Sequence, residues 1–448
     1  MLTPQQAQDR AAALIDLARM AGADAADAVY AGGSAQAVSV RLGELEDIDR
    51  SESEHLDLRV FVGRSSASIG SSDLSDAALR ELAERAVAMA GATPEDQYAG
   101  LAPEDRLHKG PLAELDIADD AQFTPQQLRD RALAAEDAAR AVAGVTNSEG
   151  GHASVAQRVF ALVTSHGFAG AYQGTMHGLS ATVVAGEGSG MQRDYAWRSA
   201  RHAADLPDPA EIGSQAGERT VQRLNPGRVK SGPMPLVFDP RVGGSLVGHL
   251  TGAMSGSSIA RRASFLLGKE GAQLFPQGIE IVDDPLRARG LSSRPFDGEG
   301  LPVARTVLVA DGRLGGWLMD SASARQLGAQ PTGHAVRGSG GSPGVSTTNL
   351  HLAAGPLSPA ELMADIADGI YVTELIGHGV NAVTGDYSRG ASGYRIVNGA
   401  LAGPVAEFTV AGNLLDMFAQ LSVANDLEWY RSVNVPTIRI DGMTVAGD

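Results

Sequence analysis

Three stretches in the first half of the chain have the apolar spacing of helices, and each begins with residues that cap a helix. Thr3-Pro4-Gln5-Gln6 and Thr124-Pro125-Gln126-Gln127 are capping boxes with proline in the first turn, in which the threonine and glutamine side chains satisfy free backbone N–H groups. Ser75 is a similar cap for a helix that ends at Gly91. We expect a fourth helix over residues 209–224.

Strands are predicted between these helices, because apolar and polar residues alternate there with a period of two. The predicted strands run from Val38 to Leu42, Leu56 to Val62, Val155 to Val163 and Leu179 to Gly186. The charged segment from Arg193 to Arg201 is expected to lead into the fourth helix.

A domain boundary is predicted at Asn225 to Pro233, a segment that is rich in proline, glycine and polar residues and lacks periodicity. This boundary divides the chain into a mixed α/β domain over residues 1–225 and a β-rich domain over residues 226–448. The predicted fold class is therefore α+β.

The β-rich half contains hairpin signals and two inserted helices. Hairpin turns are predicted at Asp311-Gly312, Asn398-Gly399 and Asp441-Gly442, since these pairs favour two-residue turns. One helix is predicted over residues 242–254, and another begins at the capping box of Ser358 and ends near Ala367.

Composition and charge narrow the classes of function. The 448 residues carry a formal net charge of -17, which repels nucleic acid. The chain has no cysteine, which excludes disulfides, thiolate metal ligands and cysteine nucleophiles. Its 55 glycines and 5% aromatic content predict short strands joined by hairpins. Because we find neither a secretory signal nor an apolar run that could span a bilayer, we expect a cytoplasmic protein without nucleic-acid or membrane partners.

One stretch near the C-terminus resembles a family signature. It begins with Thr384-Gly-Asp-Tyr-Ser-Arg-Gly-Ala-Ser-Gly-Tyr394 and continues through Asn398-Gly399 and Glu407 to Ala411-Gly-Asn413. This stretch is similar to the C-terminal signature of the TldD/PmbA family of metallopeptidase subunits. Further similarity lies at Val282-Asp-Asp-Pro285, Pro295-Phe-Asp-Gly-Glu-Gly300 and Trp317-Leu-Met-Asp320. The resemblance covers most of the chain and implies a PmbA/TldD-like fold.

The zinc motif of that family is degenerate in this chain. Members that cut peptides have a helix of the form H-E-x-x-x-H, and the matching stretch here is Gly244-Ser245-Leu246-Val247-Gly248-His249. Gly244 cannot bind a metal, Ser245 cannot act as the base, and the cysteine ligand of active members has no counterpart. The resemblance therefore implies the TldE (PmbA) branch, with no catalytic, cofactor or metal site in this chain.

The resemblance to this family also predicts a function. The resemblance implies a non-catalytic subunit that assembles with a TldD-type partner, which carries the zinc, to degrade or process small or unfolded peptides. It also implies a homodimer when the chain is isolated. Two alternatives remain open: a peptidase that uses an unrecognised site, and a protein-binding regulator of the gyrase-modulator type.

Three further patterns contain residue types that could carry chemistry. Gly340-Gly341-Ser342-Pro343-Gly344 fits the G-x-S-x-G pattern of serine hydrolases, but Pro343 lacks the N–H that would line the oxyanion hole. Asp283-Asp284 and Asp297 with Glu299 have the oxygen ligands that a hard cation needs, but adjacent prolines favour a role in capping turns. The glycine-rich loop over residues 335–346 is either a surface linker or a functional loop.

Overall fold

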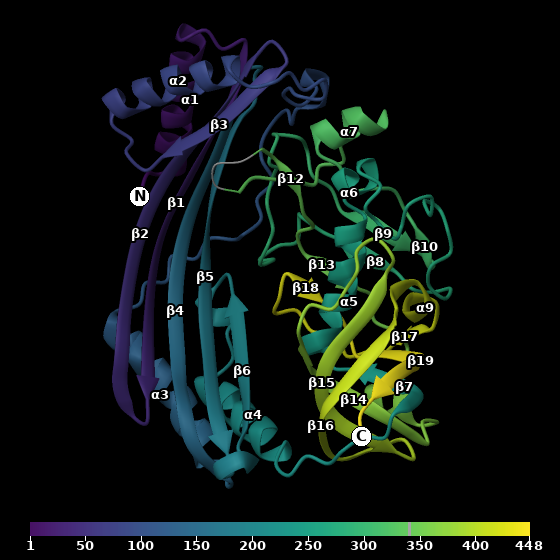
Figure 1. The fold of residues 1–448 in the computed structure, drawn as a ribbon. Helices are drawn as coiled ribbons and strands as arrows, with labels where there is room; N and C mark the ends of the chain where they lie inside the picture. Colours follow the sequence, from purple (N-terminus) through teal and green to yellow (C-terminus); the bar gives the residue numbers. More distant parts are fainter. Residues whose placement is uncertain (339–341) are drawn as a thin grey trace.

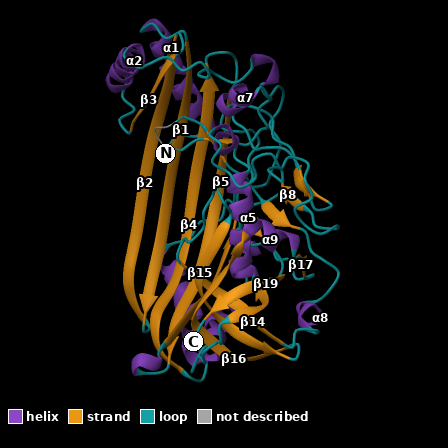
Figure 2. Ribbon diagram, turned by 45° about the vertical axis from the view of Figure 1, so that its right-hand side comes forward, coloured by secondary structure: helices purple, strands orange, loops and turns teal. Residues whose placement is uncertain are grey.

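The structure is a computed structural model that describes residues 1–338 and 342–448. Its first part, residues 1–222, is built on a tall antiparallel sheet, and its second part, residues 232–448, lies alongside that sheet (Figure 1). Long strands dominate the first part, whereas the second part mixes shorter strands, helices and many loops (Figure 2). No helix in the described residues has the length and apolarity to cross a membrane.

The sheet of the first part has the strand order β3-β2-β1-β4-β5-β6, and all neighbouring strands are antiparallel. Its strands are β1 (Ala25–Arg41), β2 (Glu44–Val62), β3 (Ser65–Ser71), β4 (Val145–Thr164), β5 (Ala169–Ala185) and β6 (Gln192–Ala200). The prediction of short strands is wrong here, because β1, β2, β4 and β5 each have 17 to 20 residues. Some glycines create space inside strands instead of ending them: a Cβ on Gly32 would lie 2.3 Å from the Tyr30 hydroxyl.

Four helices cover one face of this sheet: α1 (Pro4–Met20), α2 (Asp76–Gly91), α3 (Pro125–Ala141) and α4 (Pro209–Gln222). Successive side chains of a strand point to opposite faces. In β1, Tyr30 is buried against α1 and α2, and Val38 is buried against α3 and α4. Asp27 and Val29 point to the other face, where Val29 packs with Phe296 and Asp27 binds an arginine of the second part.

The helix caps predicted from the sequence are confirmed. Thr3 and Thr124 accept hydrogen bonds from the N–H groups of Gln6 and Gln127 at 3.3 and 3.2 Å, and each glutamine side chain accepts one from the cap N–H. Ser75 caps α2 by accepting a single hydrogen bond from the N–H of Ala78. Single turns of 3-10 helix lie at Glu104–Arg106, Gly188–Gly190 and Ala203–Asp205.

The charged segment 193–201, expected to lead into the fourth helix, instead forms most of β6. Within this strand Asp194, Ala196 and Ala200 are buried, so the period of two exists but is hidden by a buried carboxylate. Arg223 and Arg241 bind Asp194, and they come from later in the chain. A local pattern cannot reveal such a partner, which explains why the sequence did not predict this strand.

A six-stranded mixed sheet forms the base of the second part, with the strand order β16-β15-β14-β7-β19-β17 and a parallel pair β7–β14. Its strands are β7 (Gly232–Phe238), β14 (Asp368–Ile376), β15 (Asp386–Val397), β16 (Ala400–Asn413), β17 (Leu421–Val423) and β19 (Ile438–Ala446). A second sheet has the order β10-β9-β8-β13-β18. Its strands are β8 (Ile281–Asp283), β9 (Thr306–Ala310), β10 (Arg313–Leu314), β13 (Leu350–Leu352) and β18 (Val433–Asn434).

The remaining elements of the second part are one strand pair and five helices. The pair is β11 (Ala335–Val336) and β12 (Gly344–Val345), and the helices are α5 (Pro240–Ala253), α6 (Gly256–Ala260), α7 (Ser321–Leu327), α8 (Pro359–Met363) and α9 (Leu414–Ala419). Helix α5 contributes the fully buried Leu246 and Leu250 to a core that includes Phe238 and Ile370 from β7 and β14. The helix predicted over residues 242–254 is thus confirmed, and α8 is shorter than predicted.

Two of the three predicted hairpin turns are confirmed. Asp311-Gly312 joins β9 to β10, and Asn398-Gly399 joins β15 to β16, with positive φ at both residues of each turn as a type I′ turn requires. The prediction at Asp441-Gly442 is wrong, because both residues lie within β19. The register of β19 against β7 shifts between Ile440 and Met443, and Gly442 has a φ of 74°. The glycine therefore serves a β-bulge instead of a turn.

Buried polar contacts join the two parts. Asp27 of β1 binds Arg59 of β2 and Arg337, which follows β11, and all three side chains are at most 8% exposed. Burial alone would raise the pKa of Asp27, but the charges of Arg337 and Arg59 outweigh it and hold that pKa below its usual value. Arg325 of α7 donates to three backbone carbonyls of residues 98–101 at 2.8 to 3.0 Å.

Candidate functional site

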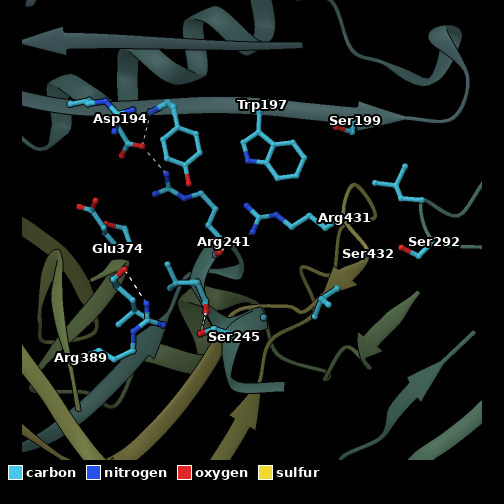
Figure 3. Close-up of a pocket in the computed structure, with 18 of the residues that line it drawn as sticks. Asp194, Trp197, Ser199, Arg241, Ser245, Ser292, Glu374, Arg389, Arg431 and Ser432 are labelled. Carbon is cyan, nitrogen blue, oxygen red and sulfur yellow. Dashed lines mark hydrogen bonds and ion pairs between the residues drawn. The ribbon is translucent and has the colours of Figure 1, made fainter. Parts of the chain in front are cut away.

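A cavity of about 800 Å³, here called the α5 cavity, lies between the two parts of the molecule at the start of α5 (Figure 3). Strand β6 lines it from the first part through residues 193–199. The second part contributes the first turns of α5, the end of β14, one residue of β15 and residues 291–292 and 431–433, and Arg223 lines the cavity from the segment that joins the two parts. Two sheets and a helix therefore fix the position of its walls.

The sequence around α5 places the degenerate motif at this cavity. Asp239 caps the helix, since its carboxylate accepts a hydrogen bond from the N–H of Arg241 at 2.8 Å, and Pro240 occupies the first turn. The helix therefore begins directly after β7 and turns Gly244 and Ser245 toward the cavity, where both are part of the wall.

The three motif residues lie in different surroundings. The Ser245 hydroxyl donates to the carbonyl of Val242 at 2.7 Å, so the helix backbone already satisfies it. His249 is half-buried, and its ring centre lies 6.1 Å from that of Tyr387 in an edge-to-face arrangement. Burial lowers the pKa of His249, and the charge of Arg389 lowers it further, so the imidazole is neutral near pH 7. Its Nε2 atom is buried without a hydrogen-bond partner among the described residues.

This donor set does not fit a zinc ion. A catalytic zinc needs three protein ligands drawn from imidazole, thiolate and carboxylate groups. Gly244 offers no side-chain donor, the hydroxyl of Ser245 is engaged, and the chain has no cysteine. In residues 1–338 and 342–448, no group of three or more His, Asp or Glu side chains is close enough together to hold a metal. These residues therefore support no metal-dependent step.

Charged side chains dominate the α5 cavity, and sequence reasoning missed them. The lining has two carboxylates, Asp194 and Glu374. It also has five arginines: Arg193, Arg223, Arg241, Arg389 and Arg431. Arg241 and Arg223 bind the buried Asp194 at 3.0 and 3.4 Å, and Arg223 also binds Glu374. These residues are far apart in the sequence, so no spacing predicted them. The one available signal was the signature stretch, which contains Tyr387 and Arg389.

Sequence models of one family match three consecutive segments of the chain. They carry the description PmbA/TldA metallopeptidase and match as domain 1 at residues 26–90, as the central domain at residues 118–224 and as the C-terminal domain at residues 231–447. The chain belongs to the PmbA/TldD metallopeptidase family. The resemblance of the stretch from Thr384 to Asn413 is thereby confirmed.

Relatives of this PmbA/TldD chain span nearly its whole length. Metalloprotease PmbA of Escherichia coli O157:H7 is 37% identical over 92% of this chain and 89% of its own. The Metalloprotease PmbA homolog of Haemophilus influenzae is 34% identical over 97% of this chain and 94% of its own.

Solved structures show the same fold as this PmbA/TldD chain. A Bacteroides thetaiotaomicron protein described as a candidate modulator of DNA gyrase superposes with a TM-score of 0.91 at 26% identity, over 100% of both chains. TldE of Thermococcus kodakarensis superposes with a TM-score of 0.86 at 22% identity, over 98% of this chain and 100% of its own. The predicted α+β, PmbA/TldD-like fold is confirmed.

Of the other carboxylates singled out in the sequence, Asp297 caps a local turn in this PmbA/TldD fold, whereas Asp283 and Glu299 bind segments that are distant in the sequence. Asp283 accepts hydrogen bonds from the N–H and hydroxyl of Thr348, and Asp297 accepts from the N–H groups of Glu299 and Leu301. Glu299 accepts two hydrogen bonds from Ser321 at 2.8 and 2.7 Å. Burial raises the pKa of Glu299 to about 7, and the nearby charge of Asp297 adds to this effect.

The glycine-rich loop is described only in part. Its ends pair as β11 and β12, and Arg337 within it reaches Asp27 of the first part. Of the G-x-S-x-G pattern over residues 340–344, residues 340 and 341 lie outside the described residues, so the structure does not address that pattern.

Proposed function

We propose that this chain is the non-catalytic TldE/PmbA-type subunit of a metallopeptidase complex whose TldD-type partner carries the zinc. The observation that carries the proposal is the donor set on α5, where glycine, serine and one histidine stand at the positions of the family's zinc motif. Relatives named metalloproteases support peptide hydrolysis as the chemistry of the complex. This chain then supplies structure and part of the substrate chamber.

The proposed substrates are small or unfolded peptides in an extended form. Strand β6 supports this, because it is the last strand of its sheet among the described residues and lines the α5 cavity. An extended peptide can pair with such an edge through backbone hydrogen bonds, which tolerate many sequences.

Three further points belong to the same proposal. The chain divides into functional domains at residues 1–225 and 226–448, which the separate sheets on either side of that boundary support. It works in the cytoplasm, where unfolded peptides arise. Without its partner it forms a homodimer, because a surface built for a related subunit can pair with a copy of itself.

The test compares the purified chain alone with a mixture that contains a TldD-type subunit from the same cell. We expect no stoichiometric zinc and no peptide cleavage in the chain alone, and chelator-sensitive cleavage in the mixture. His249→Ala should leave the activity of the mixture within about twofold, as should His152→Ala, a histidine of β4 that serves as a control. Zinc and cleavage in the chain alone, both lost in His249→Ala, would refute the proposal and favour a peptidase in its own right.

A second candidate is a protein-binding regulator. The observation that favours it is the structural neighbour described as a candidate modulator of DNA gyrase. The net charge of -17 disfavours direct contact with DNA, so regulation would act through protein contacts. Affinity purification from cells distinguishes the two: recovery of gyrase without a TldD-type protein would favour the regulator.

A further inference from the structure

The α5 cavity has a charge opposite to that of the molecule around it. The chain as a whole has a net charge of -17, but the cavity lining has five arginines against two carboxylates. Arg241 and Arg223 already bind Asp194, and Arg223 also binds Glu374. Arg193 pairs with Glu149 outside the lining, so the lining keeps a positive excess from Arg389 and Arg431, which join no ion pair among the described residues.

Arg389 is one source of this excess. It extends from β15 into the cavity, and its Nη2 atom donates to the carbonyl of Leu375 at 3.2 Å (Figure 3). Its Nε atom is buried without a hydrogen-bond partner, and none of the ion pairs among the described residues includes this arginine. An ionised group that is partly removed from water without an opposite charge is costly, so a bound anion would offset that cost.

Arg431 is the second source. Its Nη1 atom donates to the carbonyl of Arg241 at 2.9 Å, and its guanidinium lies 5.0 Å from the ring centre of Trp197. These contacts hold the planar group in place, because both a backbone oxygen and an aromatic ring restrict it. The Nε atom again lacks a partner, and Arg431 also belongs to no ion pair among the described residues.

The rest of the lining fits a peptide. Hydroxyl groups of Ser199 and Ser292 can donate to an anion, while Trp197, Val242 and Leu291 supply apolar surface for side chains. Guanidinium groups bind carboxylates through paired hydrogen bonds. A peptide has such a group at its C-terminus and in Asp and Glu side chains.

We propose that the α5 cavity is a peptide-carboxylate site, in which Arg389 and Arg431 bind the C-terminal or side-chain carboxylate of a peptide. The site needs no metal, and it makes this subunit a peptide receptor in its own right. The inference rests on the proposed function only in taking a peptide as the ligand. Binding is measured on this chain alone, so a failure of the site is distinguishable from a failure of the two-subunit peptidase.

The test uses isothermal titration calorimetry with three versions of one hexapeptide, which differ only in whether and where they carry a carboxylate. The first has a free C-terminal carboxylate, the second a C-terminal amide, and the third an amide with one internal glutamate. We expect a carboxylate-bearing version to bind at least about tenfold more tightly than the plain amide, since hydrogen bonds to charged groups are the strong ones. Binding of the first version alone identifies the terminus as the ligand, and binding of the third alone identifies the side chain.

Charge-matched variants connect the affinity to the two arginines. Arg389→Gln and Arg431→Gln should each raise Kd about tenfold or more, and Arg389→Lys should have a smaller effect because the charge remains. Arg193→Gln is the control: it removes the same charge from the same cavity, but Arg193 is 57% exposed and already pairs with Glu149, so its Kd should change less than about twofold. Thermal unfolding identifies any variant that fails to fold, and the variants that do fold then decide.

Several outcomes would overturn the site. One is equal binding of all three peptides, and another is binding of none of them. Wild-type affinity in folded Arg389→Gln and Arg431→Gln would also overturn it. Binding of inorganic phosphate without any peptide binding would show an anion site of another class.

Discussion

Replacing Asp27 with asparagine tests how the two parts of the molecule are held together. The carboxylate of Asp27 is 2% exposed and lies between Arg59 and Arg337, which are 8% and 2% exposed. Asparagine has nearly the same size and can still accept a hydrogen bond, but it has no charge. Two buried guanidinium groups would then lose their counter-charge while the packing around them stays the same.

The expected loss in the free energy of unfolding is about 3–5 kcal/mol, the usual result of removing one partner from a buried ion pair. The comparison is Asp368→Asn, which removes a carboxylate that binds Arg395 at 2.9 Å but is 55% exposed. An exposed pair of this kind contributes about 0–1 kcal/mol. The ratio of the two losses therefore measures the effect of burial.

Acid should diminish the difference between wild type and Asp27→Asn. The folded-state pKa of Asp27 lies below its ordinary value of 3.8, so the unfolded chain takes up a proton at a higher pH than the folded one. The stabilisation by Asp27 is therefore fully present above pH 3.8 and is lost as the pH falls through the lower, folded-state pKa.

Urea unfolding at pH 7 is the assay, followed by both tryptophan fluorescence and far-UV circular dichroism. Trp197 reports on the first part, and Trp317 and Trp429 report on the second. Two probes are needed because a chain of this size can unfold in more than one step. If Asp27→Asn and Asp368→Asn lose equal stability within about 0.5 kcal/mol, the reasoning from burial is wrong.

Three further predictions, one of them with a matched control, test other parts of the structure. Burial raises the pKa of Glu299 from 4.5 to about 7, so between these pH values the unfolded chain loses this proton while the folded chain keeps it. The free energy of unfolding therefore falls as the pH rises through that interval. Glu299→Gln should remove about 3 kcal/mol of this loss and flatten the pH profile of Tm between pH 5 and 8. An unchanged profile would contradict the raised pKa. A Cβ on Gly213 of α4 would lie 2.0 Å from the carbonyl oxygen of Ala135 in α3, so Gly213→Ala should cost about 1–3 kcal/mol in urea unfolding. A Cβ on Gly248 of α5 would have no neighbouring atom within 4 Å, so Gly248→Ala should instead stabilise the fold by up to about 1 kcal/mol. Equal effects of the two alanine substitutions on stability would refute the close approach of α3 and α4. Arg325→Met removes three hydrogen bonds to the carbonyls of residues 98–101 and should speed amide hydrogen exchange in that segment, while segments remote from α7 stay protected.

The elements that the sequence predicted best are those with local causes. A capping threonine and its glutamine are three residues apart, and both residues of the Asn398-Gly399 turn adopt the positive φ that the turn needs. The same chemistry can serve another purpose, as Gly442 does in the bulge of β19. Strand β6 could not be predicted locally, because the buried Asp194 depends on arginines that follow it at a distance in the sequence.

Only part of the candidate site could be predicted, again because contacts between residues that are distant in the sequence leave no local pattern. The resemblance located Gly244 and Ser245, and the structure places both on the wall of a cavity. It also singled out the stretch that contains Arg389, but not what that residue does. Arg431 could not be found from the sequence, because only folding brings it beneath Trp197 of β6.

The geometry of α5 explains how residues on the cavity side of this helix can differ without loss of the fold. The buried residues of the helix are Gly243, Leu246, Val247, Leu250 and Ala253, which follow the spacing of one helix face. Gly244 and Ser245 lie outside that face and line the cavity, so substitutions at these two positions cost no core packing. Core packing and the cavity wall therefore use different faces of one helix. The cavity face is therefore free to serve ligand recognition, and the excess of arginine in the cavity favours the binding of carboxylates.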